Sequence, residues 1–523
     1  MQKRNLTGAA FIIMSSIILS RFTGYFRTIL INNIFHTKLD IDSYFMAFKI
    51  TDLMFNLLIG GAISAALIPA LSGYIARKDE EDGWKTIGTF INTILMIMAG
   101  ISILGVIFSP QIVNVLAPGF SSASKELTVS LIRILFPSVS FIMLAGLLNG
   151  VLNSYQRFAA AAYGPIVYNL GSIASILFLY RYGVQFAAFG VMCSAIIYFL
   201  FQLSFAWKNL KYFRFKLFIH HSGVKGLFKL AIPSLLASSI IQVNVIISAS
   251  FASGFALGSI ALLTNANDTW QLPYGIFAGS VAIAILPMLS HKYAMGDIVD
   301  FRNIISKGLR NVLMINIPAM VAFVVLAQPI ISVIYKWSDK VNVNATGYVL
   351  MFYSLALITQ SILAVISRAF YAVNDTKTPL YMGICTIIIN VSLCVIFNNT
   401  TTLGVSGIAL AFSLSSAFNA FSLLFILSRK KGLFSLRSLK SFLIKVCIAS
   451  LVMGIVLFTT DKFVPVDFAA KFSSSQKLKE VTFLIIEIVS GLLIYFGIAY
   501  ALRLDEAKNI LNIAVKKLSK IKK

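Results

Sequence analysis

The sequence predicts an all-α integral membrane protein with about fourteen transmembrane helices, and three observations support this prediction. Of the 523 residues, 58% are hydrophobic and only 12% are charged, whereas a soluble globular protein carries about 25% charged residues. The apolar residues form long runs, each close to the roughly 20 residues that a helix needs to cross a bilayer. The basic residues gather in the short loops between these runs, as expected of a membrane protein.

The apolar runs define the predicted helices in chain order. They cover residues 8–35, 43–73, 87–109, 128–152, 161–180, 184–206, 228–252, 257–290, 311–335, 345–371, 380–398, 403–428, 441–460 and 481–502. The runs 43–73 and 257–290 are longer than a span requires. We therefore expect them to be tilted, kinked or extended into water, with Pro69 and Pro287 near their ends.

The distribution of basic residues predicts the orientation of the chain. There are 44 Lys and Arg residues against 19 Asp and Glu, a net charge of +25. Fourteen spans place both termini on one side, and about 30 basic residues fall on that side against about 9 on the other. The termini are therefore predicted to be cytoplasmic. No basic domain is present, so the charge indicates membrane orientation and not nucleic-acid binding.

The sequence also predicts an internal repeat. Pro69 in IPALSGY corresponds to Pro287 in LPMLSHKY, and Gln156 in NSYQRF corresponds to Asn374 in YAVNDTKTP. The two pairs share one and the same offset in the numbering, which we call the repeat offset. Six helices separate the equivalent positions, so both halves have the same topology.

Four regions follow from this repeat. They are an N-terminal six-helix lobe at 1–215, a C-terminal six-helix lobe at 216–435, two additional helices at 436–502 and a basic amphipathic tail at 503–523. The two lobes are expected to surround a central cavity. The tail alternates apolar residues with lysines, which is typical of a helix on the inner membrane surface.

Charged residues inside the spans are the first candidates for function, because such charges are costly in lipid. Five are basic, Arg21, Arg27, Lys49, Arg133 and Arg368, and four are acidic, Asp42, Asp52, Asp268 and Glu487. Arg21 lies near the middle of the first span, and Lys49 and Asp52 share one face of the second.

Two interpretations of these charges are open. Arg21, Arg27 and Lys49 suit an anionic head group, since the planar fork of arginine matches phosphate oxygens. The alternative is a buried ion-pair network that only locks helices together. For Arg133, Arg368 and Glu487 we expect such structural pairing.

The sequence carries no signature of an enzyme. It has no GxxxxGK[ST] loop for ATP and no evident nucleophile–base set. The four Cys residues lie in apolar runs and the four His residues show no metal-ligand spacing, so neither a disulfide nor a zinc site is expected. We expect no cofactor.

Several motifs resemble a known family. SRFTGYFRTILINNIF at 20–35 and DIDSYFMAFKITDLMFNLLIGGAISAALIPALSGY at 40–74 closely resemble the opening of the MurJ/MviN family. Further matches are LAPGF at 116–120, LNSYQRF at 152–158, QLPYGIFAGSVAIAILPMLS at 271–290 and NDTKTP at 374–379. Members of this family are bacterial lipid II flippases of the wider MATE-like exporter superfamily.

The resemblance implies a fold and a substrate. It implies fourteen helices, a central cavity between two lobes, and two extra helices that form a lipid-facing groove. The implied substrate is undecaprenyl diphosphate bearing a disaccharide-peptide, whose diphosphate meets a cationic cavity. By motif position, Ser20, Arg21, Arg27 and Asp42 match residues important in the family.

This chain departs from the family pattern at several positions. Thr28 stands where an Asp often follows the second Arg, and Phe55, Asn56 and Gly60 stand where many members have two Arg and a Glu. Asp268 replaces an Arg of the eighth helix, so we expect it to pair with Arg21 or Arg27 in one state of the cycle.

The family's sodium-site carboxylates are not evident in the later helices. Asn244 and Asn390 are the polar candidates there, and coupling to a monovalent cation or to protons is open.

The sequence therefore predicts a transporter that flips lipid II from the cytoplasmic to the outer leaflet by alternating access. Diphosphate binding is assigned to Arg21, Arg27 and Lys49, and a cavity or gating role to Ser20, Asp42, Asp52 and Asp268. The expected setting is the bacterial inner membrane, with membrane lipids and the cell-wall synthesis machinery as partners, no nucleic acid, and a monomeric state.

Three alternatives remain. The first is a multidrug or organic-cation exporter, which Asp52 and Asp268 would suit. The second is an exporter of another lipid-linked oligosaccharide. The third is a membrane scaffold or an intramembrane enzyme, which the mid-membrane arginines and the missing catalytic set disfavour.

Overall fold

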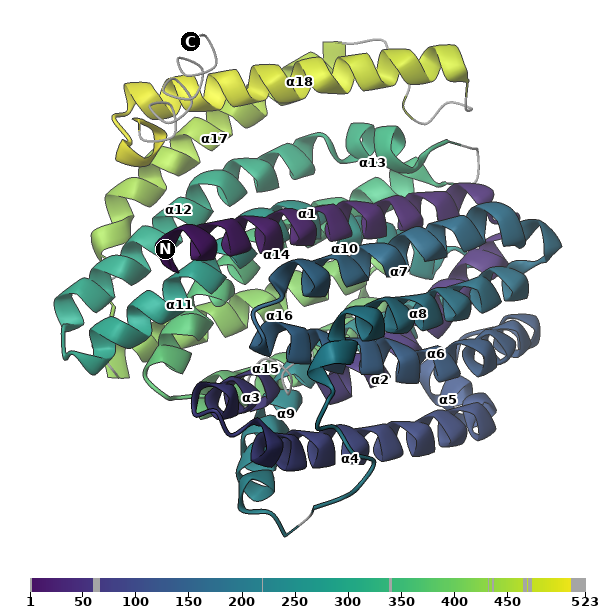
Figure 1. Ribbon diagram of the computed structural model, residues 1–523. Coiled ribbons are helices and arrows are strands. Elements are labelled where there is room, and N and C mark those ends of the chain that lie inside the picture. Colours follow the sequence, from purple (N-terminus) through teal and green to yellow (C-terminus); the bar gives the residue numbers. More distant parts are fainter. Residues whose placement is uncertain are drawn as a thin grey trace, which may run out of the picture. The chain divides into compact units, whose positions relative to one another are not determined.

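A computed structural model describes most of the chain. The described residues are 2–59, 66–218, 220–337, 341–430, 432–434, 437–463, 468 and 473–508, and several stretches of helical side chains, among them 2–14, 54–59 and 232–241, lie outside the description. The described part is helical and contains no strand (Figure 1). Residues 509–523 of the predicted amphipathic tail lie outside the described residues.

The helices follow one another closely. The α-helices are α1 (Gln2–Ile34), α2 (Lys38–Ile59), α3 (Ile68–Ala76), α4 (Glu80–Ile107), α5 (Ser109–Leu116), α6 (Ser122–Ser154), α7 (Phe158–Leu179), α8 (Val184–Ala206), α9 (Ser222–Ala252), α10 (Ser259–Pro273), α11 (Gly279–Ala294), α12 (Ile298–Val325), α13 (Ala327–Tyr335), α14 (Val343–Ala372), α15 (Lys377–Thr400), α16 (Val405–Phe425), α17 (Arg437–Phe463) and α18 (Ser474–Ala501).

Internal contacts divide the chain into two units, Met1–Ala261 and Leu262–Lys523. Helices α1 to α9 belong to the first unit and α11 to α18 to the second, while α10 begins in the first and continues in the second. The four regions predicted from the sequence are not distinguished by this division and stay a prediction.

The helix boundaries carry the repeat. The repeat offset of the sequence separates both ends of α4 from the corresponding ends of α12, and it also separates the last residues of α1 and α9, of α3 and α11, and of α6 and α14. Gln156 and Asn374, which are equivalent in the repeat, both adopt φ of 60°. A non-glycine residue rarely takes this left-handed conformation, so its recurrence at equivalent turns supports a duplicated architecture.

Eleven of the described helices are long and apolar enough to cross a membrane. The other three predicted spans fall on α1, α2 and α9, each of which has side chains outside the description, so the count of fourteen stays a prediction. The long run at 257–290 is not one straight helix. A π turn at Tyr274–Ala278 follows Pro273 and joins α10 to α11, whereas Pro287 lies inside α11.

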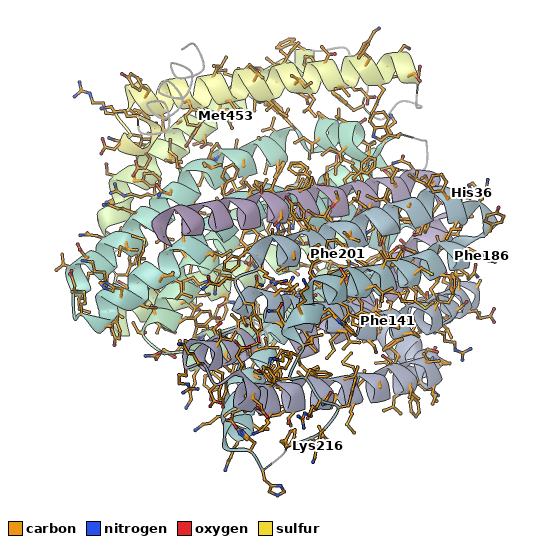
Figure 2. The ribbon with its side chains drawn as sticks, in the orientation of Figure 1. His36, Phe141, Phe186, Phe201, Lys216 and Met453 are labelled. Carbon is orange, nitrogen blue, oxygen red and sulfur yellow. The ribbon has the colours of Figure 1, made fainter. Side chains whose placement is uncertain are left out.

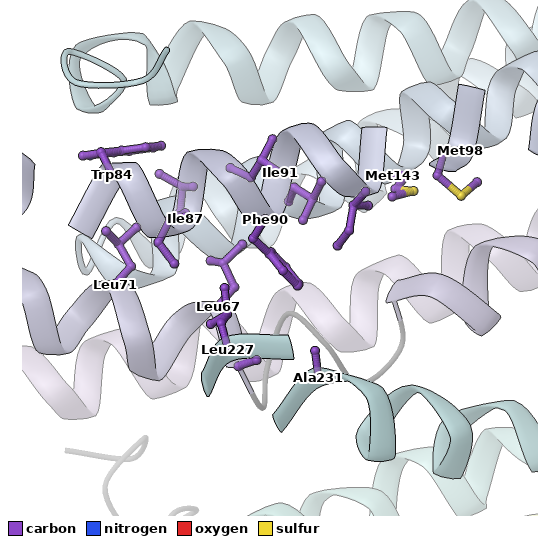
Figure 3. Close-up of a cluster of buried hydrophobic side chains, with 14 of the residues drawn as sticks. Leu67, Leu71, Trp84, Ile87, Phe90, Ile91, Met98, Met143, Leu227 and Ala231 are labelled. Carbon is purple, nitrogen blue, oxygen red and sulfur yellow. The ribbon is translucent and has the colours of Figure 1, made fainter. Parts of the chain in front are cut away.

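The first unit is held by a cluster of buried side chains from α3, α4, α6 and α9 (Figure 3). Leu71, Trp84 and Phe90 are at most 1% exposed within it. Trp84 donates from Nε1 to the hydroxyl of Tyr155 (3.2 Å), which donates to Glu80 (2.8 Å). The polar atoms of Trp84 and Tyr155 at the edge of the cluster therefore have hydrogen-bond partners, as is usual for buried polar groups.

Three phenylalanine side chains of α6 and α8, Phe141, Phe186 and Phe201, are labelled in Figure 2. Phe141 of α6 packs against Phe199 of α8 with ring centroids 6.1 Å apart, while Phe186 on α8 is 55% exposed. Large exposed apolar side chains on many helices suit lipid as the surrounding solvent. The protein is a multi-pass membrane protein.

In the second unit, α14 packs against α11, α12, α13 and α16. Asn316 of α12 donates to the hydroxyl of Ser361 on α14 (2.7 Å), both fully buried. Helices α17 and α18 run side by side (Figure 1), and α17 also packs against α12. Met453 of α17, labelled in Figure 2, is 2% exposed.

Candidate functional site

The predicted diphosphate-binding residues lie on α1 and α2 of the first unit, and α7 fixes the position of α1. The side-chain amide of Asn169 on α7 donates to the carbonyl oxygen of Ser20 (3.0 Å) and approaches the Ser20 hydroxyl (3.4 Å) and that of Thr23 (3.3 Å). Asn169 is 8% exposed. One buried amide therefore fixes the turn of α1 that carries Arg21.

Sequence reasoning missed Asn169. A lone Asn inside the apolar run 161–180 was the available signal, because amide side chains commonly hydrogen-bond between membrane helices. Ser20 was named from its motif position, and its oxygen atoms accept from Asn169.

Arg21 and Arg27 have different surroundings. Arg21 is exposed, and it makes no hydrogen bond or ion pair within the part of the chain that the structure describes. It lies about 20 Å from the Ile34 end of α1 at 1.5 Å per residue. Arg27 is half-buried, and its guanidinium lies 5.3 Å from the ring centroid of Phe48 on α2. This cation–π distance favours a fixed position for Arg27.

Lys49 and Asp52 share one face of α2, as their spacing predicted, with Lys49 half-buried and Asp52 exposed. Arg27 and Asp52 both act electrostatically on Tyr44, which is buried on α2, and on Tyr168, which is half-buried on α7. The first unit therefore gathers the α2 carboxylate near the second α1 arginine, around two phenol side chains.

Asp42 is buried at the start of α2, where it caps α10. Its carboxylate accepts from the backbone N–H groups of Gly258 (2.7 Å), just before that helix, and Ala261 (2.9 Å), in its first turn. A carboxylate at a helix N-terminus satisfies free N–H groups and interacts favourably with the helix dipole. Asp42 is thus tied to the helix that carries Asp268, and its predicted gating role stays a prediction.

The remaining candidates lie apart from this group in the chain. Asp268 is half-buried in the second unit. The next residue, Thr269, donates to the hydroxyl of Tyr335 (3.4 Å). Asn244 belongs to the first unit and Asn390, fully buried, to the second. Within the described residues, no group of three or more His, Cys, Asp and Glu could hold a metal ion.

Arg133 and Arg368 each have a side-chain neighbour, but neither forms the expected ion pair within the described residues. Arg133 donates from Nε to the hydroxyl of Ser109 (3.1 Å), and the guanidinium of Arg368 lies 5.7 Å from the ring centroid of Tyr371. Glu487 is different, because both carboxyl oxygens lack a hydrogen-bond partner among the described residues. The expectation of pairing is wrong for Glu487. The side chains of Phe55 and Asn56, and all of Gly60, lie outside the described residues.

The arrangement in the first unit is cationic. Arg21, Arg27 and Lys49 contribute three positive charges and Asp52 one negative charge, while Asp42 is committed to α10. Such a set can attract an anion, and two arginines can each present a planar pair of donors to phosphate oxygens.

Comparison with known proteins gives a consistent result. The family model described as lipid II flippase MurJ matches residues 31–476. A probable lipid II flippase MurJ of Buchnera aphidicola (strain APS) is 30% identical over 454 residues, 84% of this chain and 87% of that protein. A probable lipid II flippase MurJ of Rickettsia prowazekii is 29% identical over 504 residues, 94% of this chain and 96% of that protein.

Solved structures agree. A lipid II flippase MurJ in an inward closed conformation superposes with a TM-score of 0.78 at 26% identity, covering 95% of this chain and 99% of that one. An inward-facing MATE family multidrug transporter gives a TM-score of 0.68 at 17% identity, covering 79% and 95%; this likeness shows the fold alone. From the match over most of its length, the chain belongs to the lipid II flippase MurJ family.

Proposed function

We propose that this protein flips lipid II, the undecaprenyl-diphosphate-linked peptidoglycan precursor, from the cytoplasmic to the outer leaflet by alternating access. Family membership supports the substrate class. The protein is on this proposal a transporter that leaves its substrate chemically unchanged. The diphosphate is the part of the substrate that most needs binding groups from the protein. Moving an unpaired phosphate charge from water into the hydrocarbon core of the membrane costs a large free energy.

The observation that carries the proposal is an asymmetry between the repeats. Arg21, Arg27 and Lys49 lie in the first repeat. At the repeat offset their counterparts are Ser239, Val245 and Asn267, all uncharged. A duplicated fold needs no such difference for stability, so the cations of the first copy are best explained by a ligand of opposite charge.

The acidic residues do not make an organic-cation exporter the better proposal. Asp52 offsets one of three cations, and Asp42 caps α10, which leaves the group on α1 and α2 positive. An organic-cation exporter would need the opposite balance. An exporter of another lipid-linked oligosaccharide would use the same diphosphate chemistry, so the glycan has to be tested directly.

The setting completes the proposal. The chain would lie in the bacterial inner membrane with cytoplasmic termini, as its loop charges favour. It would act as a monomer beside the cell-wall synthesis machinery. Transport would be coupled to protons or a monovalent cation, with no cofactor.

The test is complementation of a bacterial strain depleted of its own lipid II flippase. The native chain is expected to restore growth and lipid II exposure at the outer membrane face, measured with a membrane-impermeant enzyme that cleaves lipid II. Arg21→Ala and Arg27→Ala should each reduce flipping about 10- to 100-fold, since a hydrogen bond to a charged group contributes about 1.5–3 kcal/mol.

Arg133→Ala is the matched control, because it removes another intramembrane arginine whose Nε donates to Ser109. It should leave flipping near the native level. Full activity of both Arg21→Ala and Arg27→Ala at native protein levels would contradict the diphosphate-binding role. Growth rescue without lipid II exposure would point to a different lipid-linked substrate.

A further inference from the structure

Helix α18 buries a single seam of residues. The buried positions are Lys477, Glu480, Leu484, Glu487, Gly491, Tyr495 and Ala499. Their spacing of three and four residues is that of one helix face packed against neighbouring helices. Helix α18 packs against α17, α13 and α12, so the seam faces protein while the rest of the helix faces outward.

The polar groups at both ends of this seam are paired. Glu480 accepts from Ser332 (2.7 Å) and from Lys477 (3.2 Å), and Lys336 lies 3.9 Å from its other oxygen. Tyr495 donates to the backbone oxygen of Met314 (2.6 Å). The seam therefore follows the usual rule that buried polar groups find partners.

Glu487, in the middle of the seam, breaks this rule. It is 1% exposed, and neither carboxyl oxygen has a hydrogen-bond partner among the described residues. It lines a groove of about 330 Å³ between α17 and α18. The other lining residues are Thr459, Thr460, Phe463, Phe483, Ile486 and Ser490. A buried, unpaired carboxylate is costly, so this position calls for a partner that supplies positive charge or a donated proton.

The hydroxyl groups around the groove cannot supply that donor. Thr459 donates to the backbone oxygen of Val456 (2.8 Å), as does Thr460 (3.0 Å), and Ser490 donates to the backbone oxygen of Glu487 (3.0 Å). With their hydrogens committed to their own helices, these side chains offer only lone pairs to the groove. The polar lining therefore consists of acceptors.

The charged groups of the packed helices do not neutralise Glu487 either. Asp461 on α17 acts on it electrostatically with the same sign. Lys336, just after α13, donates to the backbone oxygen of Phe468 (2.9 Å) and lies beside Glu480. Arg310 on α12 is bridged to Glu506 (3.3 Å). The local field at Glu487 is therefore negative.

We propose that the groove between α17 and α18 is a cation site in which Glu487 binds a proton or a monovalent metal ion. A proton would give the carboxyl the donor that its surroundings lack. A metal ion would be bound by the carboxylate with the oxygens of Thr460 and Ser490 as further ligands. The site lies outside the cationic group of α1 and α2, and its occupation can be measured without any transported substrate.

The experiment labels the full-length protein in liposomes with dicyclohexylcarbodiimide, which reacts with protonated carboxyl groups in apolar surroundings. Labelling of each carboxyl is quantified by mass spectrometry between about pH 5 and pH 9, in sodium-free choline buffer and again in sodium buffer of equal ionic strength. Glu480 is the internal control, since it is equally buried on the same seam but paired.

Preferential labelling of Glu487 over Glu480, at least tenfold and falling as pH rises, is expected. If sodium leaves this labelling unchanged, the bound cation is a proton; if sodium suppresses it at constant pH, a monovalent metal ion competes for the site. Equal labelling of the two residues, or no labelling of Glu487 at any pH in sodium-free buffer, would overturn the proposal.

Two variants sharpen the result. Glu487→Gln carries its own amide donors, so it should keep the melting temperature and lose both the label and any protection by sodium. Asp461→Asn removes a neighbouring negative charge and should move the midpoint of Glu487 labelling to lower pH, because the ionised carboxylate is then repelled less. An unchanged pH midpoint of Glu487 labelling would contradict the electrostatic effect assigned to Asp461.

Discussion

A single buried carboxylate, Asp42, connects the start of α2 to the first turn of α10. Its two hydrogen bonds to the N–H groups of Gly258 and Ala261 lie in a region where water cannot replace them. Asp42→Ala is therefore expected to destabilise the protein by about 2 kcal/mol, within the range for helix caps. The measurement is the apparent melting temperature in detergent.

Asp42→Asn separates capping from gating. The amide oxygen can replace only one of the two carboxylate oxygens that accept from Gly258 and Ala261, so this variant should unfold between the native chain and Asp42→Ala. If Asp42 only caps α10, Asp42→Asn should also flip lipid II normally; loss of flipping in a stable Asp42→Asn protein would assign it a further role. Equal melting temperatures of Asp42→Ala and the native chain would refute the capping role.

At the residue scale, the sequence predicted the charged candidates but not the residues that hold their helices in place. Arg21, Arg27 and Asp42 are conspicuous because charge is rare inside apolar runs. Asn169 is not conspicuous, and its importance depends on which helix lies opposite. The sequence of α7 alone does not contain that information, since a side-chain partner 149 residues away is set by tertiary packing.

At the scale of elements, α18 is fastened to α13 by a buried charge cluster. Lys336, Lys477 and Glu480 are 3%, 5% and 2% exposed. The ammonium group of Lys477 also lies 5.2 Å from the ring centroid of Trp337. Removing the shared anion would leave two lysines buried without their carboxylate, and breaking a buried ion pair costs about 3–5 kcal/mol.

Glu480→Ala should accordingly lower the melting temperature strongly, while Glu480→Ala combined with Lys477→Met should recover part of the loss. A partial recovery is expected because Lys336 keeps its bond to the Phe468 carbonyl and because apolar replacement of a buried pair is often tolerated. Similar stability of Glu480→Ala and the native chain, measured by thermal unfolding in detergent, would show that this cluster does not fasten α18.

Hydropathy predicted the membrane helices well, because a segment in lipid has to form its backbone hydrogen bonds within itself. Eleven predicted spans coincide with helices long and apolar enough to cross a membrane. Hydropathy did not predict where the long run 257–290 breaks, since the π turn after Pro273 depends on local backbone geometry. Nor did it predict the burial of Lys336 and Lys477, which a count of loop charges treats as exposed.

At the scale of the whole molecule, the duplication is clearer in the helix boundaries of the two halves than in their sequences. The repeat offset recurs at helix ends from α1 to α6 and at the left-handed turns of Gln156 and Asn374. Packing and turn geometry tolerate many sequences, provided that the apolar faces and the few strained turns are kept. The cations of α1 and α2 have no counterparts in the second copy, so the shared architecture does not require them.

The orientation of the molecule can be tested across one helix. Gln185 lies at the start of α8, and Lys216 follows its end; both side chains are exposed. One span separates them, so they must lie on opposite sides of the membrane. In a variant with its four cysteines replaced by serine, Gln185→Cys should react with a membrane-impermeant maleimide in intact spheroplasts. Lys216→Cys should react only after permeabilisation, because the loop that carries Lys208, Lys211 and Arg214 is predicted to be cytoplasmic. The reverse pattern would invert the topology, and equal labelling of both positions in intact spheroplasts would mean that α8 does not span the bilayer.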